Sequence, residues 1–292
     1  MKVSWIGAGI MGLPMARHLL EGDAVERLAV HNRTPERAAP LVEAGARLAT
    51  SVADAVRDAD VVFTMVSFPA DVEAVYLGAD GILAHARPGA LAVDMTTSSP
   101  ALAARVAEEG ARRGVTVLDA PVSGGPAGAE NGTLSIMVGG EAGAFDTVRP
   151  LLERMGSAVV HHGPAGSGQS AKLVNQALVA GVTLACCESF ALGQASGLDI
   201  GKLRESVRPG VAGSPLLDFV WSRLQAGDLE PGFKLDHFIK DLGLIAEVSD
   251  GLPGVQLVDR IARAVRSDRG GGRGTQALAT ALPGWADRPQ AD

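Results

Sequence analysis

Three glycines near the N-terminus have the spacing that lets a backbone wrap around a pyrophosphate. Gly7, Gly9 and Gly12 form the pattern G-x-G-x-x-G. The first glycine permits a tight turn, the second lets the backbone approach the phosphates, and the third lets a helix pack close to its strand. The N-terminus of that helix adds free N–H groups and the positive end of its dipole. We therefore predict that this turn binds a dinucleotide.

Glycine is abundant in this chain, at 37 of 292 residues, so the glycine pattern alone is weak evidence for a dinucleotide site. The elements predicted around the turn make it stronger. An apolar run at 3–6 predicts a strand, helical spacing from Leu13 to Leu20 predicts a helix, and 28–30 predict a second strand. This order favours a dinucleotide site over the alternative, an ordinary turn between a strand and a helix. Gly7, Gly9, Gly12 and Pro14 interrupt the apolar stretch at 3–16, which argues against a secretory signal peptide.

The end of the second predicted strand indicates which dinucleotide is bound. NAD sites usually carry Asp or Glu about 20 residues after the glycines, where it binds a ribose hydroxyl. Here the strand runs into Asn32, Arg33 and Thr34, and the first carboxylate is Glu36. The planar fork of Arg33 suits a 2′-phosphate, and its neighbours add neutral hydrogen bonds. We expect NADP, with NAD less favoured; the alternative is that Arg33 is a solvated surface residue.

Lysine is the scarce basic residue of this chain, which draws attention to each one present. Only five of the 26 basic residues are lysines, and the others are arginines. Lys172 lies in an otherwise apolar helical stretch, and Asn175 follows three residues later on the same face. A cofactor domain supplies a hydride carrier, so the protein itself must supply proton transfer and substrate binding. Lys172 is therefore a candidate for the proton-transferring group.

Composition excludes several classes of protein. The net charge of −7 argues against nucleic-acid binding, which needs a basic face. The longest apolar run, 177–187, ends at Glu188 and is too short to span a bilayer, so we expect no membrane partner. The adjacent Cys186 and Cys187 cannot easily pair with each other, which favours a reducing cytoplasm. No cysteine or histidine cluster has metal-ligand spacing, so no metal is expected.

The order of the predicted elements divides the chain in two. Strands at 61–65, 91–93, 115–118, 135–138 and 158–160 alternate with helical stretches, which predicts a doubly wound parallel sheet. Beyond about residue 163 only helical periodicity remains, with one long helix over 166–197 and a glycine-rich loop over 268–274. We predict an α/β protein: an NADP-binding Rossmann-type domain at 1–163, followed by an all-α domain at 164–292 for the substrate and for dimerisation.

Five segments together resemble the β-hydroxyacid dehydrogenases, a family that includes 3-hydroxyisobutyrate dehydrogenase, tartronate semialdehyde reductase and the glyoxylate/succinic semialdehyde reductases. The resemblance runs from Val3 to about Val265. Its segments are GAGIMGLPMA at 7–16, DMTTSSP at 94–100, DAPVSGG at 119–125, GSGQSAKLVN at 166–175 and FIKDL at 238–242.

The resemblance implies a role for each candidate of the catalytic and substrate sites. Lys172 protonates the carbonyl oxygen in reduction, or takes the hydroxyl proton in oxidation, since burial lowers the pKa of a lysine toward the working pH. Asn175 holds the substrate or Lys172, and Ser123, Gly124 and Gly125 bind the substrate carboxylate. The ordinary alternatives are a structural ion pair, a surface amide and a simple tight turn.

The resemblance also assigns residues to the cofactor. Thr96 contacts the nicotinamide side and Lys240 returns to the cofactor from the second domain; a capping role and a helix-surface role are their alternatives. The remaining cofactor residues implied in the same way are Ile10, Met11, Met65 and Val66, beside the glycines and the segment 32–34.

Two departures from the family pattern concern the substrate. Many members carry two consecutive asparagines after the lysine, whereas Gln176 follows Asn175 here. The segment 270–276 also lacks the usual acidic residue after a glycine pair. We expect a small carboxylate-bearing β-hydroxy or ω-hydroxy acid and its semialdehyde as substrates, in a homodimer or homotetramer. The alternatives are an imine reductase of the same fold, in which Asp or Tyr usually replaces the lysine, and a non-catalytic dinucleotide-binding relative.

Overall fold

The computed structural model describes residues 1–283 and 285, and the chain divides into two compact units. The first unit is Met1–Lys172 and the second is Leu173–Asp292. The division falls inside the long helix α9 (Ser167–Ala195), whose first turns belong to the first unit. The end of the predicted second domain, 284 and 286–292, lies outside the described residues.

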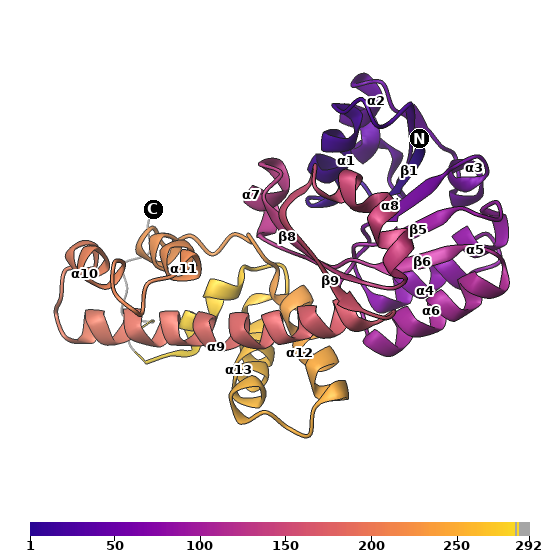
Figure 1. Ribbon diagram of the computed structural model, residues 1–292. Helices are drawn as coiled ribbons and strands as arrows, with labels where there is room; N and C mark the ends of the chain where they lie inside the picture. Colours follow the sequence, from indigo (N-terminus) through magenta and orange to yellow (C-terminus); the bar gives the residue numbers. More distant parts are fainter. Residues whose placement is uncertain (284, 286–292) are drawn as a thin grey trace. The chain divides into compact units, whose positions relative to one another are not determined.

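The first unit is built on one sheet with the strand order β3-β2-β1-β4-β5-β6-β8-β7, and β9 pairs with β8 (Figure 1). From β3 to β6 every pair is parallel, so these carboxyl ends meet at one edge. The order reverses between β1 and β4, which is where ligands bind in open α/β sheets. The strands are β1 (Lys2–Ile6), β2 (Arg27–His31), β3 (Arg47–Leu48), β4 (Val61–Thr64), β5 (Leu91–Asp94), β6 (Thr116–Asp119), β7 (Val122–Ser123), β8 (Leu134–Gly139) and β9 (Gly156–Gly163).

The predicted α/β class with a doubly wound sheet is confirmed, although the sheet is not parallel at the side that holds β8. Strand β8 runs antiparallel to both β6 and β7. The connection from β7 to β8 contains only the short helix α7 (Gly125–Glu130), and a connection that short returns the chain antiparallel. Sequence patterning also missed β3 and β7, since each strand has two residues and no period can be read from so few.

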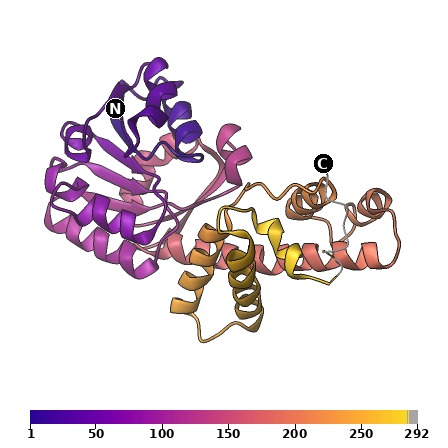
Figure 2. The same cartoon turned by 180° about the vertical axis from the view of Figure 1, so that it is seen from behind.

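Helices cover both faces of this sheet, and each face has its own core (Figures 1 and 2). Alternating side chains of a strand point to opposite faces, so Trp5 and Phe63 pack on one face and Ile6 on the other. Trp5 and Phe63 stack with ring centroids 5.6 Å apart. The helices of this unit are α1 (Gly12–Leu20), η1 (Pro35–Ala38), α2 (Ala39–Glu43), α3 (Val52–Val56), α4 (Pro69–Leu77), α5 (Ile82–His85), α6 (Pro100–Arg112), α7 and α8 (Ala142–Leu152).

The second unit is helical, as predicted. Trp221, Phe190 and Phe238 are fully buried in its core, and the Trp221 indole donates to the Cys186 carbonyl oxygen at 2.9 Å. The predicted loop at 268–274 begins later than expected, because Arg269 is the last residue of α13. Gly270 caps this helix with φ +85°. Besides α9, the helices are α10 (Ile200–Val207), α11 (Pro215–Gln225), α12 (Leu235–Val248), α13 (Pro253–Arg269) and η2 (Thr275–Ala281).

Helix α9 carries an exposed apolar stripe. Val174, Leu178 and Leu192 are each about two-thirds exposed, and by length and apolar character α9 qualifies as a candidate membrane span, with 44% of its most apolar window buried. The search for apolar runs missed this helix because Gln176 and Glu188 end the run at 177–187, whereas the mean hydropathy of a longer window tolerates single polar residues. Core helices of soluble proteins pass the same test, so this is weak evidence of a membrane. The expected homodimer or homotetramer stays a prediction.

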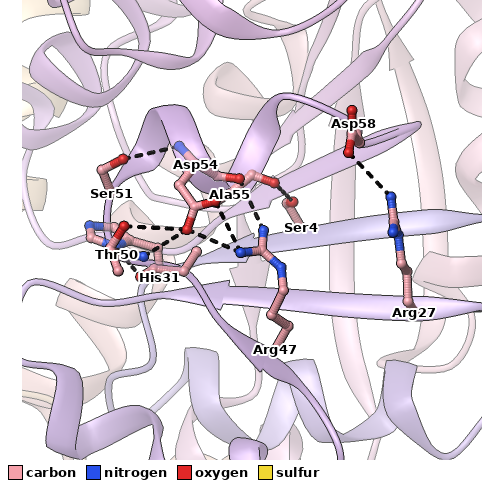
Figure 3. A network of polar contacts seen from close by, with 10 residues as sticks. Ser4, Arg27, His31, Arg47, Thr50, Ser51, Asp54, Ala55 and Asp58 are labelled. Atoms are coloured by element: carbon pink, nitrogen blue, oxygen red, sulfur yellow. Dashed lines mark hydrogen bonds and ion pairs between the residues drawn. The ribbon is translucent and has the colours of Figure 1, made fainter.

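A polar cluster fixes the turn between β3 and α3 (Figure 3). Asp54 accepts two hydrogen bonds of 3.0 Å from the Arg47 guanidinium and one of 2.9 Å from the Thr50 N–H. Ser51 caps α3 by accepting from the Asp54 N–H. The hydrogen bonds from Thr50 and Arg47 hold the pKa of Asp54 below its usual value. The cluster ties β3 to α3, and β3 pairs with β2, the strand that precedes Arg33.

A buried carboxyl group lies at the end of β5. Asp94 accepts a hydrogen bond of 2.8 Å from the Thr64 hydroxyl, which itself lies 3.1 Å from the Tyr76 hydroxyl. The backbone N–H of Thr96 donates to the same carboxyl oxygen at 3.1 Å. Burial raises the pKa of Asp94 to about 6, because these hydrogen bonds only partly offset the cost of removing the charge from water.

The raised pKa of Asp94 predicts a pH-dependent stability. The folded state holds this proton more tightly than the unfolded chain, so its contribution to the free energy of unfolding falls as pH rises from about 4 to about 6. A shift of about two units corresponds to about 3 kcal/mol. We expect Asp94→Asn to remove this slope in urea unfolding curves measured between pH 4.5 and 7.5. Asp23→Asn, at an exposed carboxyl, is the control; wild-type and Asp94→Asn curves that stay parallel would contradict the assignment.

Candidate functional site

The glycine turn has the geometry predicted for it. Gly7 adopts φ +102°, and a Cβ there would lie 2.2 Å from the Met65 carbonyl oxygen, so a side chain is excluded on both counts. A Cβ on Gly12 would lie 2.0 Å from the Gly7 carbonyl oxygen, which itself accepts a hydrogen bond from the Trp5 indole. Both positions therefore require glycine for a turn this tight.

The same turn has room for phosphates. A Cβ on Gly9 would meet nothing within 4 Å, so the backbone there faces open space. The N-terminus of α1 follows directly, and it has no side-chain cap. Met11 stands at that N-terminus, and Ile10 is 64% exposed beside it. Open space and an uncapped helix N-terminus fit the pyrophosphate of a dinucleotide.

After β2, Asn32 makes hydrogen bonds within the protein, whereas Arg33 extends into solvent. The Asn32 carboxamide oxygen accepts from the Ala8 N–H at 2.8 Å, and its amide nitrogen donates to the Thr34 carbonyl oxygen at 2.7 Å. Asn32 therefore ties the strand end to the glycine turn. The Arg33 side chain is 91% exposed and lies 3.7 Å from an Asp71 carboxyl oxygen. Its guanidinium stands in water at the position expected to recognise the adenosine ribose.

Thr96 holds neighbouring strand ends together. It is 1% exposed, and its hydroxyl accepts from the Val66 N–H at 3.0 Å. Met65, one residue earlier, donates its N–H to the Ile6 carbonyl oxygen at 2.9 Å. The segments after β1, β4 and β5 are thus joined at the carboxyl edge of the sheet. The structure gives Thr96 this supporting role, and its contact with a nicotinamide stays a prediction.

The turn at 123–125 connects β7 to α7. Ser123 pairs with Ser135 of β8, while Gly124 and Gly125 adopt φ +133° and +62°. A Cβ on Gly125 would meet nothing within 4 Å. The turn therefore presents backbone with open space beside it. The carboxylate site expected at this turn stays a prediction.

The start of α9 is fastened to the sheet by Asp119 and Gln169, which sequence reasoning had not singled out. The Asp119 carboxylate at the end of β6 accepts from the Gly166 N–H at 2.7 Å and the Gln169 N–H at 2.8 Å. The Gln169 side chain accepts from the Ser98 N–H at 2.8 Å and donates to the Thr96 carbonyl oxygen at 2.7 Å. Burial raises the pKa of Asp119, and the backbone N–H donors oppose that rise.

Lys172 lies on the next turn of the same helix and is 6% exposed. The first turn of α9 packs so closely that a Cβ on Gly168 would lie 2.4 Å from the Met137 carbonyl oxygen. The fastened turn therefore fixes where the Lys172 backbone stands relative to β5, β6 and β8. A buried lysine on a rigid support is what proton transfer requires.

The second unit holds the other two predicted residues in one hydrogen-bonded group. The Asn175 amide donates to the Gln176 carboxamide oxygen at 2.8 Å, and the Gln176 amide donates to an Asp241 carboxyl oxygen at 2.5 Å. The Lys240 ammonium lies 2.9 Å from the other Asp241 oxygen. Asn175 and Lys240, which were predicted independently, are thus linked through two buried residues: Asn175 contacts Gln176, Gln176 contacts Asp241, and Asp241 contacts Lys240.

The structure gathers the predicted residues into two groups. The first unit brings the glycine turn, the segment 32–34, Val66 and Thr96 to the carboxyl edge of its sheet and fastens the helix of Lys172 beside β6. The second unit joins Asn175 to Lys240. Within the described residues, 1–283 and 285, no cluster of three His, Cys, Asp or Glu side chains has the arrangement of a metal site.

Two family models cover nearly the whole chain. Residues 2–163 match the NAD-binding domain of 6-phosphogluconate dehydrogenase, and residues 166–282 match the NAD-binding domain of NADP-dependent 3-hydroxyisobutyrate dehydrogenase. The chain belongs to the β-hydroxyacid dehydrogenase family. It is therefore an NAD(P)-dependent oxidoreductase, which confirms the resemblance that the motifs indicated.

Curated relatives agree with this family. An uncharacterized oxidoreductase of Bacillus subtilis is 41% identical, with 94% of this chain and 96% of the relative covered. The NAD-dependent L-serine dehydrogenase of Pseudomonas aeruginosa is 40% identical over 85% of each protein. The 3-hydroxyisobutyrate dehydrogenase of the same organism is 39% identical over 83% of each.

Solved structures share the fold. Psf3 in complex with NADP⁺ and 2-OPP has a TM-score of 0.89 at 28% identity, covering 96% of this chain and 99% of that one. Mycobacterium tuberculosis 3-hydroxyisobutyrate dehydrogenase with L-serine has a TM-score of 0.85 at 29% identity, covering 97% and 99%. An imine reductase of Myxococcus stipitatus with NADP⁺ is 22% identical with a TM-score of 0.65, covering 97% and 100%, and shows the fold alone.

The fastening of α9 predicts a large effect at Gln169. Gln169→Ala leaves the buried Ser98 N–H and Thr96 carbonyl oxygen without their partner, and each such loss costs about 1–3 kcal/mol. We expect the free energy of unfolding in urea to fall by about 2–5 kcal/mol. Ser170→Ala, at the exposed next position of the helix, should change it by less than about 0.5 kcal/mol. Equal, small effects of both substitutions would contradict the proposed fastening.

Proposed function

We propose that the enzyme interconverts a small hydroxy acid, with its hydroxyl at the β or ω carbon, and the corresponding semialdehyde, using NADP. One observation carries this proposal: a buried lysine, Lys172, stands on a helix turn fastened to the carboxyl edge of the dinucleotide-binding sheet. Proton transfer to or from the carbonyl oxygen beside a nicotinamide needs such a group. Asn175, one turn later on α9, supplies an amide for the same substrate.

The residues divide the work of the reaction. The bound nicotinamide supplies or accepts the hydride. Lys172 donates a proton to the carbonyl oxygen during reduction and takes the hydroxyl proton during oxidation. Asn175 orients the reacting oxygen, while the Ser123 hydroxyl and the backbone of Gly124 and Gly125 hold the carboxylate. Binding the carboxylate holds the reacting carbon in a fixed position relative to Lys172 and the cofactor, which lowers the entropic cost of reaching the transition state.

The relatives support this substrate class. The names of two of them, L-serine dehydrogenase and 3-hydroxyisobutyrate dehydrogenase, denote acids with a hydroxyl on the β carbon. Both acids carry a carboxylate, the group that the turn at 123–125 is proposed to bind. Lys172 is present here, which favours hydroxy-acid chemistry over the alternatives of an imine reductase and a non-catalytic dinucleotide-binding protein.

The preference for NADP rests on Arg33. Its guanidinium is exposed, and its separation of 3.7 Å from Asp71 makes a weak surface ion pair that a 2′-phosphate can replace. The segment between β2 and Arg33 carries no carboxylate to bind a ribose hydroxyl. One relative is named as NAD-dependent, so the cofactor is a point on which family members differ.

A panel of aldehydes tests the substrate class. We expect succinic semialdehyde, methylmalonate semialdehyde, glyoxylate or tartronate semialdehyde to be reduced with NADPH. Matching aldehydes without the carboxylate should have kcat/KM values lower by about 100-fold or more, because charged hydrogen bonds are worth about 1.5–3 kcal/mol each. Turnover of butyraldehyde or a cyclic imine at the same rate would overturn the proposal.

Lys172→Ala provides the control for that panel. It should lower kcat by at least about 100-fold, the usual loss for a general acid or base, while NADPH binding survives. Binding measured by nucleotide fluorescence separates a chemical defect from an unfolded protein. Near wild-type turnover in a folded Lys172→Ala variant would exclude Lys172 as the proton donor.

Arg33→Asp tests the cofactor. The new carboxylate repels a 2′-phosphate and accepts hydrogen bonds from ribose hydroxyls, so the ratio of kcat/KM for NADPH to that for NADH should fall by about tenfold or more. Arg37→Asp, in η1 just beyond, changes charge equally and is the matched control. A wild-type enzyme that uses both cofactors equally would refute the preference.

A further inference from the structure

Two buried residues of the second unit connect the amide of Asn175 with the ammonium of Lys240. Gln176 is 3% exposed and Asp241 is 2% exposed. The connection runs from Asn175 to Gln176 at 2.8 Å, from Gln176 to Asp241 at 2.5 Å, and from Asp241 to Lys240 at 2.9 Å. Two predicted functional residues on different helices, α9 and α12, thus share one continuous set of contacts.

The carboxylate of Asp241 decides which atoms donate and which accept in these contacts. A carboxylate only accepts hydrogen bonds, so the Gln176 amide nitrogen must face Asp241 and its oxygen must face Asn175. Asn175 must then present its own nitrogen to Gln176. Asp241 therefore decides, through Gln176, which end of the Asn175 carboxamide points back into the protein.

Burial makes the set rigid. The Lys240 side chain is 12% exposed and that of Asp241 is 3% exposed, so both charges have lost most of their water. An ion in such surroundings is costly unless an opposite charge and hydrogen bonds satisfy it. Lys240 supplies the opposite charge to one Asp241 oxygen and the Gln176 amide supplies a hydrogen bond to the other, so displacing either partner would leave a buried charge poorly compensated.

We propose that Gln176 and Asp241 are positioning residues that orient Asn175 toward the substrate and Lys240 toward the cofactor, so that the two binding events are coupled. This inference rests on the proposed function for the roles of Asn175 and Lys240. It also explains the departure at 176: glutamine is one methylene longer than the asparagine common in the family, and here its amide reaches Asp241.

Titrations with NADPH alone test the cofactor half of the proposal on the full-length protein. We expect Gln176→Leu and Asp241→Asn to raise the Kd for NADPH by about tenfold, the loss typical of one charged hydrogen bond. In a Lys240→Met background, Gln176→Leu should have no further effect, because its influence passes through Lys240. An unchanged Kd, or an equal effect in both backgrounds, would overturn this half.

Steady-state kinetics test the substrate half. Gln176→Leu should raise KM for the best semialdehyde by about tenfold, and the rise should vanish when Asn175 is already alanine. Gln176→Asn, a milder change, should show the same pattern if the leucine variant folds poorly. A KM effect that persists in the Asn175→Ala background would overturn this half.

Thr183→Val is the matched structural control. Thr183 lies on the same helix, is fully buried and has a hydroxyl without a hydrogen-bond partner among the described atoms. The Thr183→Val substitution should leave the Kd for NADPH and the KM for the semialdehyde unchanged. A change in either constant as large as that caused by Gln176→Leu would overturn the proposal. Failure of the wild type to reduce any semialdehyde would refute the proposed function, while the NADPH titrations would still decide the role of Gln176 and Asp241.

Discussion

The carboxylate of Asp119 binds the backbone at the start of α9, and the placement of the candidate catalytic residues depends on that contact. Gly166 and Gln169 give it their N–H groups, which are among the donors that a helix cannot satisfy within itself. A negative charge at a helix N-terminus also interacts favourably with the helix dipole. Because Asp119 ends β6, this contact sets the position and direction of the helix that carries Lys172.

Close backbone packing makes the contact possible. Gly168 lies where a Cβ would overlap the Met137 carbonyl oxygen, so α9 can begin against β8 only with glycine there. Gln169 then uses both ends of its carboxamide on the backbone at 96 and 98. The same backbone is held from the other side by Asp94, whose pKa is raised to about 6 by burial. Buried polar groups thus connect the strand ends and the helix into one scaffold.

The two units solve the problem of buried charge in different ways. In the first, Asp119 is satisfied by backbone N–H groups alone. In the second, Asp241 has a lysine on one oxygen and a glutamine amide on the other. Because Asp119 binds backbone N–H groups, it positions the start of a helix. Because Asp241 binds the side chains of Gln176 and Lys240, it positions those side chains. This difference matches the roles proposed for the two residues, one supporting Lys172 and the other Asn175 and Lys240.

Local features of this protein could be predicted from the amino-acid sequence because they depend on neighbours along the chain. Apolar runs located β1, β2, β4, β5, β6, β8 and β9, helical periodicity located α9, and glycine spacing located the phosphate turn. Lys172 stood out by composition and setting. What the tertiary structure decided are contacts between distant positions: Asp119 with Gly166, 47 residues apart, and Gln176 with Asp241, 65 apart. Periodicity records which face of an element is buried, but not which buried polar atom meets which partner. That pairing, like the antiparallel turn into β8, is fixed only when the elements pack and each desolvated group must find a partner.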